Sequence, residues 1–81
     1  PFNPRTEIRF TLPTAEKVSV QVYDVVGRLV RTLHNGNLDS GDHAMVWNGR
    51  NEKGAEVGSG VYFAKVRNNT SIKTQKMLLL K

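Results

Sequence analysis

His34 and His43 are the side chains of this 81-residue sequence best suited to proton transfer near neutral pH. They fall in what the pattern predicts to be different elements, and the chain has no cysteine to act with them. Asp42 directly precedes His43, but neighbouring residues of a strand point to opposite faces, so the usual orienting hydrogen bond is not expected. The sequence therefore predicts no catalytic triad, and we expect a protein that is not an enzyme.

Several oxygen-bearing side chains in the expected loops could coordinate a cation such as Ca²⁺, which needs about six converging oxygen ligands. They are Asp39, Asp42, Asn48, Asn51 and Glu52. Their spacing matches no calcium-loop pattern, and Asp and Asn are also the ordinary residues of turns. We interpret them as turn residues, and we expect neither a metal nor another cofactor.

Asn68-Asn69-Thr70 and Asn69-Thr70-Ser71 both fit the short pattern for N-glycosylation. The same residues are common in hairpin turns, because Asn tolerates the backbone angles that a turn requires. We interpret Asn68-Asn69 as the two-residue tip of a hairpin.

Basic residues are concentrated near the C-terminal end. The chain has 12 Lys and Arg against 7 Asp and Glu, a net charge of +5. The excess consists of Lys65, Arg67, Lys73, Lys76 and Lys81, with no acidic residue among them. Lysines commonly protect an edge strand from unwanted pairing, and they would also attract an anionic partner.

The placement of the aromatic residues argues against nucleic acid as the anionic partner. Phe10, Trp47 and Tyr62 fall on expected core faces, and no aromatic residue is interleaved with the last basic stretch. The longest strongly apolar run is the four residues from Met77 to Leu80, whereas a membrane helix needs about 20. We expect no nucleic-acid binding and no membrane insertion.

Apolar and polar residues alternate with a period of two, which indicates β-strands rather than helices. We expect strands at residues 7–12, 17–22, 29–33, 43–47, 61–67 and 72–80, and a tight loop or short ribbon at residues 48–54, ahead of Val57. A loop is expected from His34 to Asp42, and a β-bulge near Gln75, where the apolar pattern changes phase. Five turn glycines are expected to include several with positive φ: Gly27, Gly41, Gly49, Gly54 and Gly60.

About seven short strands predict an all-β, immunoglobulin-like antiparallel β-sandwich. Residues 1–81 are expected to form a single domain, and because the sequence starts at Pro1 rather than Met, a fragment of a larger protein. The apolar phase of the strands predicts one core, formed by Ile8, Phe10, Val18, Val20, Val22, Met45, Trp47, Tyr62, Val66 and Leu79.

A series of short motifs in a fixed order resembles a known family, the type IX secretion C-terminal sorting domains. That family is itself similar to the immunoglobulin-like domain of the flagellar hook-capping protein. The resemblance covers nearly the whole chain, although the sorting family often has Asp where this sequence has Asn48. Its motifs are Pro1-Phe2-Asn3-Pro4, Ile8-Arg9-Phe10, Tyr23-Asp24-Val25-Val26-Gly27-Arg28, Gly41 through Asn51, Gly54, Gly58 through Phe63, and Lys76 through Lys81.

The resemblance implies a domain that directs an exported cargo protein across the bacterial outer membrane to the cell surface. Its implied partners are the outer-membrane secretion machinery, a surface sorting peptidase and an N-terminal cargo domain of the same chain. The alternative is a non-catalytic structural or adhesive immunoglobulin-like module of an extracellular enzyme or hook-associated protein. For the sorting role, we expect recognition through the last strand, by Ile72, Lys73, Lys76, Met77, Leu78, Leu79, Leu80 and Lys81.

Overall fold

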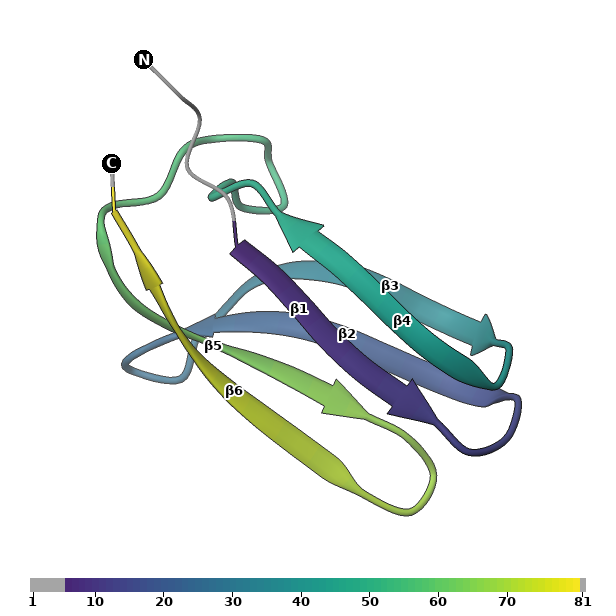
Figure 1. Ribbon diagram of the computed structural model, residues 1–81. Coiled ribbons are helices and arrows are strands. Elements are labelled where there is room, and N and C mark those ends of the chain that lie inside the picture. The colour runs from purple at the N-terminus through teal and green to yellow at the C-terminus, as the bar shows by residue number, and fades with distance from the viewer. Residues whose placement is uncertain (1–5, 81) are drawn as a thin grey trace.

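Six β-strands and their connections make up the part of the chain that the computed structural model describes, residues 6–80 (Figure 1). No helix occurs among these residues. The strands are β1 (Thr6–Leu12), β2 (Glu16–Asp24), β3 (Leu29–Leu38), β4 (Gly41–Trp47), β5 (Gly60–Arg67) and β6 (Ile72–Leu79). The prediction of an all-β fold is confirmed.

The strands form two antiparallel sheets that pack face to face (Figure 1). One sheet has two strands, β1 and β4, and the other has four, in the order β3-β2-β5-β6. Alternate residues of each strand point into the space between the sheets, as the period-two pattern predicts. The fold is an immunoglobulin-like sandwich with six strands, where the sequence predicted about seven.

Residues 48–54 form a tight loop ahead of Val57, one of the two forms that the sequence predicted, and no strand lies between β4 and β5. Asn51 Oδ1 accepts hydrogen bonds from the Lys53 and Ala55 N–H groups, both at 3.0 Å. Only one isolated antiparallel bridge forms in this segment, between Arg50 and Glu56. A chain that folds back on itself so tightly cannot also extend a sheet.

The core lies between the two sheets and contains nearly all the residues predicted for it. Only Met45, on β4, is incompletely buried, and it packs against the core from its margin. Leu12, Ala64 and Met77 are core residues that the prediction did not include. The buried set is Ile8, Phe10, Leu12, Val18, Val20, Val22, Trp47, Tyr62, Ala64, Val66, Met77 and Leu79.

β3 is longer than predicted. Asn35-Gly36-Asn37 was expected to be a loop, but these residues pair with Ser19, Val18 and Lys17 of β2. Pairing with β2 satisfies their backbone groups, and this gain exceeds the weak strand propensity of Asn and Gly. The connection from β3 to β4 is therefore reduced to Asp39 and Ser40.

The β-bulge predicted near Gln75 is wrong. The β5–β6 register is continuous from Gly60 opposite Leu79 to Arg67 opposite Ile72. Ile72 points outward and is 58% exposed, so Met77 and Leu79 face inward without any change of phase. The register shifts occur instead between β2 and β3, at Val20/Gln21 and Val22/Tyr23.

The prediction for the turn glycines is confirmed, since all five have positive φ. The values are +88° for Gly27, +116° for Gly41, +76° for Gly49, +80° for Gly54 and +150° for Gly60.

The β5–β6 connection differs from its prediction. It has four residues, 68–71, rather than a two-residue Asn68-Asn69 tip. Asn68 Oδ1 closes it by accepting hydrogen bonds from the N–H groups of Thr70 and Ser71 at 3.0 and 2.8 Å. None of the residues from 6 to 80 forms a helix that could cross a membrane.

Candidate interaction surfaces

The two histidines lie on different strands and each bonds a backbone carbonyl. His34 Nε2 lies 3.2 Å from the Gly36 carbonyl oxygen, and His43 Nε2 lies 2.7 Å from that of Asp39. The Asp42 carboxylate does not orient His43, because its Oδ1 accepts a hydrogen bond from the Thr11 hydroxyl at 2.7 Å. The His43 ring stacks on Phe10, with centroids 5.5 Å apart. Both histidines thus have structural contacts.

No group of three or more His, Cys, Asp or Glu side chains that could hold a metal ion occurs within residues 6–80. The side chains of Asp42, Asn51 and Glu52 form hydrogen bonds within the fold, and Asp42 lies in β4 rather than in the predicted loop. Asn51 organises its own turn, and the Glu52 carboxylate accepts a hydrogen bond from the Thr32 N–H of β3. The interpretation of Asn51 as a turn residue is confirmed.

β6 is an edge strand, which is where the sequence placed the candidate recognition residues. Ile72, Lys73, Lys76, Leu78 and Leu80 are exposed. Met77 and Leu79 are 3% and 1% exposed, so these two side chains belong to the core and are unavailable to a partner. Lys81 lies outside the described residues.

The two edges of the four-stranded sheet differ in how far they are covered. At the β3 edge, the Glu52 N–H donates to the Val30 carbonyl at 3.1 Å, and Arg31 Nη1 donates to the Asn51 carbonyl at 3.0 Å. At the β6 edge, within residues 6–80, a single long-range side-chain hydrogen bond forms, from Gln75 Nε2 to the Glu7 carbonyl at 3.4 Å. β6 is therefore the more open edge.

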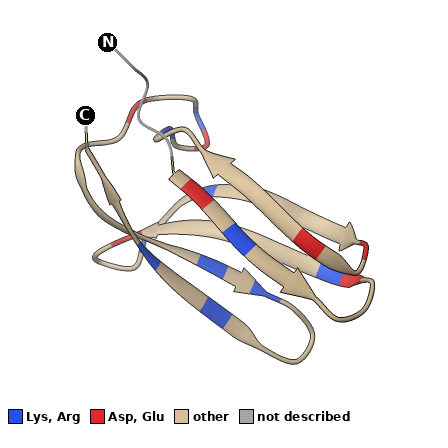
Figure 2. Ribbon diagram, in the orientation of Figure 1, with Lys and Arg blue, Asp and Glu red and all other residues tan. Residues whose placement is uncertain are grey.

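The β5–β6 hairpin is uniformly cationic. It carries Lys65, Arg67, Lys73 and Lys76, and Figure 2 shows blue bands and no red band along these two strands. The ion pairs formed within residues 6–80 lie outside this hairpin and join Arg9 to Glu7, Arg28 to Asp24 and Arg50 to Glu56. Lys65 Nζ lies 4.7 Å from the centre of the Tyr23 ring, a cation–π contact. The hairpin therefore has positive charge that no acid within residues 6–80 neutralises.

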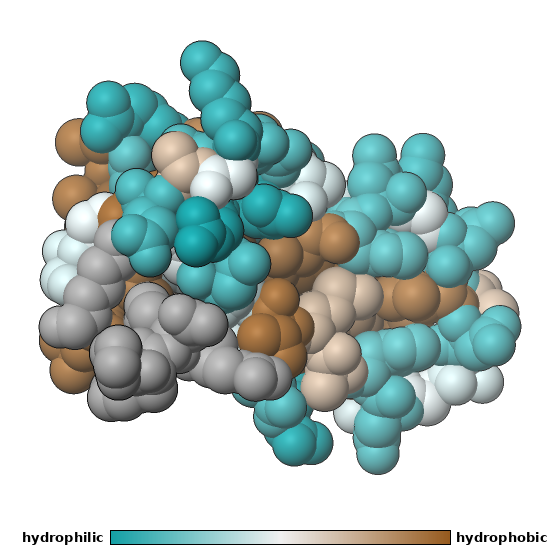
Figure 3. Space-filling model, turned by 90° about the horizontal axis from the view of Figure 1, so that it is seen from above, coloured by the Kyte–Doolittle hydropathy of each residue, from teal (hydrophilic) through white to brown (hydrophobic). Residues whose placement is uncertain are grey.

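One end of the sandwich presents apolar side chains that we call the end patch: the exposed Val25, Val26, Leu78 and Leu80, and the half-buried Val61. Val25 and Val26 are 67% and 70% exposed, and Leu78 and Leu80 are 60% and 65% exposed. Val61 pairs with Leu78 and lines a surface hollow together with Val25 and Val26. Figure 3 shows brown residues at the left end, where Figure 1 places the β2–β3 turn and the end of β6.

The turn that carries Val25 and Val26 is held rigidly by Asp24. Its Oδ1 accepts hydrogen bonds from the N–H groups of Val26 and Arg28 at 3.1 and 2.9 Å, and its Oδ2 accepts one from Arg28 Nε at 2.9 Å. The Arg28 N–H, followed by the Arg28 guanidinium, lowers the pKa of the Asp24 carboxyl below its ordinary value of 3.8. Sequence reasoning identified this turn but not the surface it displays, since only the fold brings it beside Val61.

The fold and these surfaces define the class of the protein: a small immunoglobulin-like β-sandwich module. The family model described as "FlgD Ig-like domain" matches residues 4–71, and the chain belongs to this family.

Known relatives agree with this assignment. The chain is 42% identical over 48 residues to the basal-body rod modification protein FlgD of Salmonella typhimurium (strain LT2), and equally to that of Salmonella typhi. Each match covers 59% of this chain and 21% of the relative, so the chain spans about a fifth of the length of these curated relatives.

A solved structure shows the same architecture. The crystal structure of FlgD from P. aeruginosa is similar with a TM-score of 0.71 and 25% identity, over 93% of this chain and 58% of that one. These matches support the hook-capping part of the resemblance found in the sequence, while the type IX sorting part stays a prediction.

Proposed function

We propose that this chain is a non-catalytic structural module of a FlgD-type, hook-associated protein, and that it works by binding other protein surfaces. The observation that carries the proposal is the family match over residues 4–71.

The end patch is the surface that we assign to this protein contact. Contiguous exposed apolar side chains on a small domain commonly mark a protein interface. Here they stand on a turn that Asp24 fixes, so little conformational freedom is lost when a partner binds. The partner is expected to be a neighbouring subunit or domain of the flagellar assembly that offers an apolar surface of its own.

The test is a domain replacement in FlgD of Salmonella typhimurium, in which this chain takes the place of the immunoglobulin-like domain. We expect the chimera to restore more swimming motility than a FlgD lacking that domain. The matched control carries Trp47→Ala, which removes a buried ring and should strongly destabilise the module. A folded, stably produced chimera that swims no better than the deletion would refute the proposal.

A second candidate function is the sorting role predicted from the sequence, with the protein secreted or held at the cell surface. It is supported by the position of β6 at the open sheet edge, where an extended segment of the secretion machinery could add as a further strand. The exposed Lys73 and Lys76 would then contribute charge recognition, together with the exposed Ile72, Leu78 and Leu80.

This candidate is tested by fusing a reporter to the module in a bacterium that has a type IX system. We expect Lys73→Gln/Lys76→Gln to reduce secretion while leaving the melting temperature nearly unchanged, because exposed charges contribute about 1 kcal/mol or less. The control, Lys17→Gln/Lys53→Gln, makes the same change in net charge away from β6. Equal secretion of both variants removes the charge-recognition claim, and secretion of the reporter without the module removes the sorting role.

A further inference from the structure

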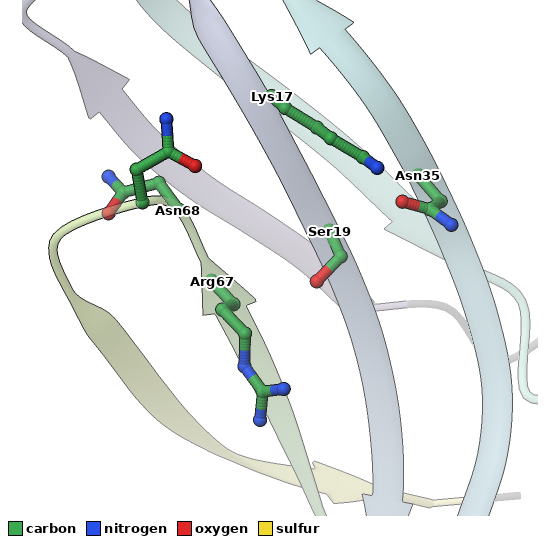
Figure 4. Close-up of a pocket in the computed structure, with 6 residues that line it drawn as sticks. Lys17, Ser19, Asn35, Arg67 and Asn68 are labelled. Atoms are coloured by element: carbon green, nitrogen blue, oxygen red, sulfur yellow. The ribbon is translucent and has the colours of Figure 1, made fainter.

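The outer face of the four-stranded sheet has a shallow hollow of about 170 Å³, lined by polar and basic residues, which we call the Ser19 hollow (Figure 4). Its volume is several times the ~30 Å³ share of one water molecule. Three strands and the β5–β6 loop contribute to it. It is lined by Lys17, Ser19, Asn35, Arg67, Asn68 and Asn69.

Strand register explains why these residues meet. Ser19 of β2 lies directly opposite Asn35 of β3 on one side and Arg67 of β5 on the other. Ser19 alternates with the buried Val18 and Val20, so this row of three points away from the core. The packing of the sandwich therefore holds the row in place from below.

The side chains around Ser19 are free for a ligand. Within residues 6–80, the structure gives no side-chain hydrogen bond or ion pair to Lys17, Ser19, Asn35, Arg67 or Asn69. The hollow also has no acidic residue in its lining, although it contains two cations. Figure 4 shows the Lys17 ammonium reaching toward Asn35 and the Arg67 guanidinium extending on the other side of Ser19.

The chemistry of the lining narrows the class of ligand. Two unneutralised cations favour an anion, and a guanidinium matches a carboxylate with two parallel hydrogen bonds. Asn and Ser side chains both donate and accept hydrogen bonds, which suits a ligand rich in hydroxyl groups. No aromatic side chain lines the hollow, so nucleobases would find nothing to stack on.

We propose that the Ser19 hollow binds an acidic sugar, such as a uronic acid residue of a glycan. Arg67 and Lys17 bind its carboxylate groups, and the side chains of Ser19, Asn35 and Asn69 bind its hydroxyl groups. The ligand is expected to be longer than one sugar, because the two cations lie on different sides of Ser19 (Figure 4). This site is separate from the end patch and from β6, and does not depend on the function proposed above.

The test is a titration of the 81-residue chain followed by amide NMR. The probe is trigalacturonate, compared with neutral galactotriose, inorganic phosphate and a polyglutamate peptide. We expect saturable shifts confined to residues near Ser19, Asn35 and Arg67, with the tightest binding for trigalacturonate. Phosphate or polyglutamate binding as tightly would show general anion or peptide binding and overturn the proposal, as would the absence of a saturable shift.

Variants locate the binding. Arg67→Gln should weaken trigalacturonate binding about tenfold, because a charged hydrogen-bonding partner is lost, and Ser19→Ala should weaken it less. Both positions lie on the outer face, so the spectrum of each variant should otherwise match the parent. Lys53→Gln is the control, as it removes an equal charge from the distant 48–59 loop. Equal weakening by Lys53→Gln, or unchanged affinity in Arg67→Gln, would contradict the proposed site.

Discussion

Trp47 and Tyr62 meet edge to face between the two sheets, with ring centroids 4.9 Å apart and an interplanar angle of 63°. Trp47 is the last residue of β4 and is fully buried, while Tyr62 lies on β5. Each ring also anchors a loop. Trp47 Nε1 donates to the Arg50 carbonyl at 2.9 Å, and the Tyr62 hydroxyl donates to the Gly58 carbonyl at 2.7 Å. This pair ties both sheets to the 48–59 segment.

Trp47→Ala should therefore remove a large part of the stability of the fold. Truncating a buried aromatic residue costs about 3–5 kcal/mol, against a total of roughly 4–12 kcal/mol for a chain of this length. Urea unfolding followed by circular dichroism measures the change. Val46→Ala, at a position that is 42% exposed on the same strand, is the control and should cost about 1 kcal/mol or less.

Trp47→Phe tests the same relationship if the alanine variant fails to fold. It keeps an aromatic ring beside Tyr62 but loses the hydrogen bond to Arg50, so we expect a smaller loss of about 1–2 kcal/mol. A Trp47→Ala variant as stable as Val46→Ala would show that the ring pair does not hold the sheets together.

Gly27→Ala should lower stability through the backbone alone. Gly27 has φ of +88°, and a Cβ added there would meet no atom within 4 Å. The left-handed conformation costs an L-residue roughly 1–2 kcal/mol, and each kcal/mol lowers the melting temperature by about 4–8 °C in a domain of this size.

Gly36→Ala is the matched control for Gly27→Ala. Its Cβ would lie 3.8 Å from His34 Nε2, an ordinary van der Waals contact, and its φ is not in the positive range. We expect its melting temperature to stay the same or rise slightly, because alanine restricts the unfolded chain. Equal destabilisation by both substitutions would show that the positive φ does not set the cost at Gly27.

Asp24→Asn should make the stability of the domain depend less on pH in the acidic range. The pKa of Asp24 is lowered in the folded chain, so ionised Asp24 stabilises the fold fully above its ordinary pKa of 3.8. This stabilisation is lost as the pH falls through the lower, folded pKa. Asparagine keeps the Oδ1 acceptor for Val26 and Arg28 but carries no charge at any pH.

Urea midpoints of the parent and Asp24→Asn, measured from pH 7 to pH 2, check this expectation. The advantage of the parent should be constant near neutral pH and should shrink below pH 3.8. An advantage that stays constant or grows on acidification would contradict the role of the Asp24 charge.

Sequence reasoning succeeded where one face of a strand is buried. In β2, Val18, Val20 and Val22 alternate with polar residues, and the period-two pattern places them in the core without knowledge of the partners. It failed where tertiary pairing decides the structure. Asn35 and Asn37 have the composition of a loop, yet pairing with β2 makes them strand residues.

The candidate surfaces were predictable to different degrees. The basic residues of β5 and β6 were visible in the sequence because they are close together along the chain. The end patch and the Ser19 hollow were not, because each joins residues that only the strand register brings together. Ser19 and Arg67, for example, are partners across β2 and β5 although 48 positions separate them in the sequence.

Swimming motility of the FlgD chimera with a disrupted end patch tests the central claim, that the module works by protein contact. The chimera would carry Val25→Ser/Val26→Ser, or Val46→Ser as an exposed apolar control outside the patch. Both variants should fold, since the substituted side chains are largely exposed and surface changes have small effects on stability. We expect the double substitution to reduce motility well below that of the Val46→Ser chimera, at equal protein levels. Motility that is the same for both would contradict the claim that the end patch is the contact surface of this module.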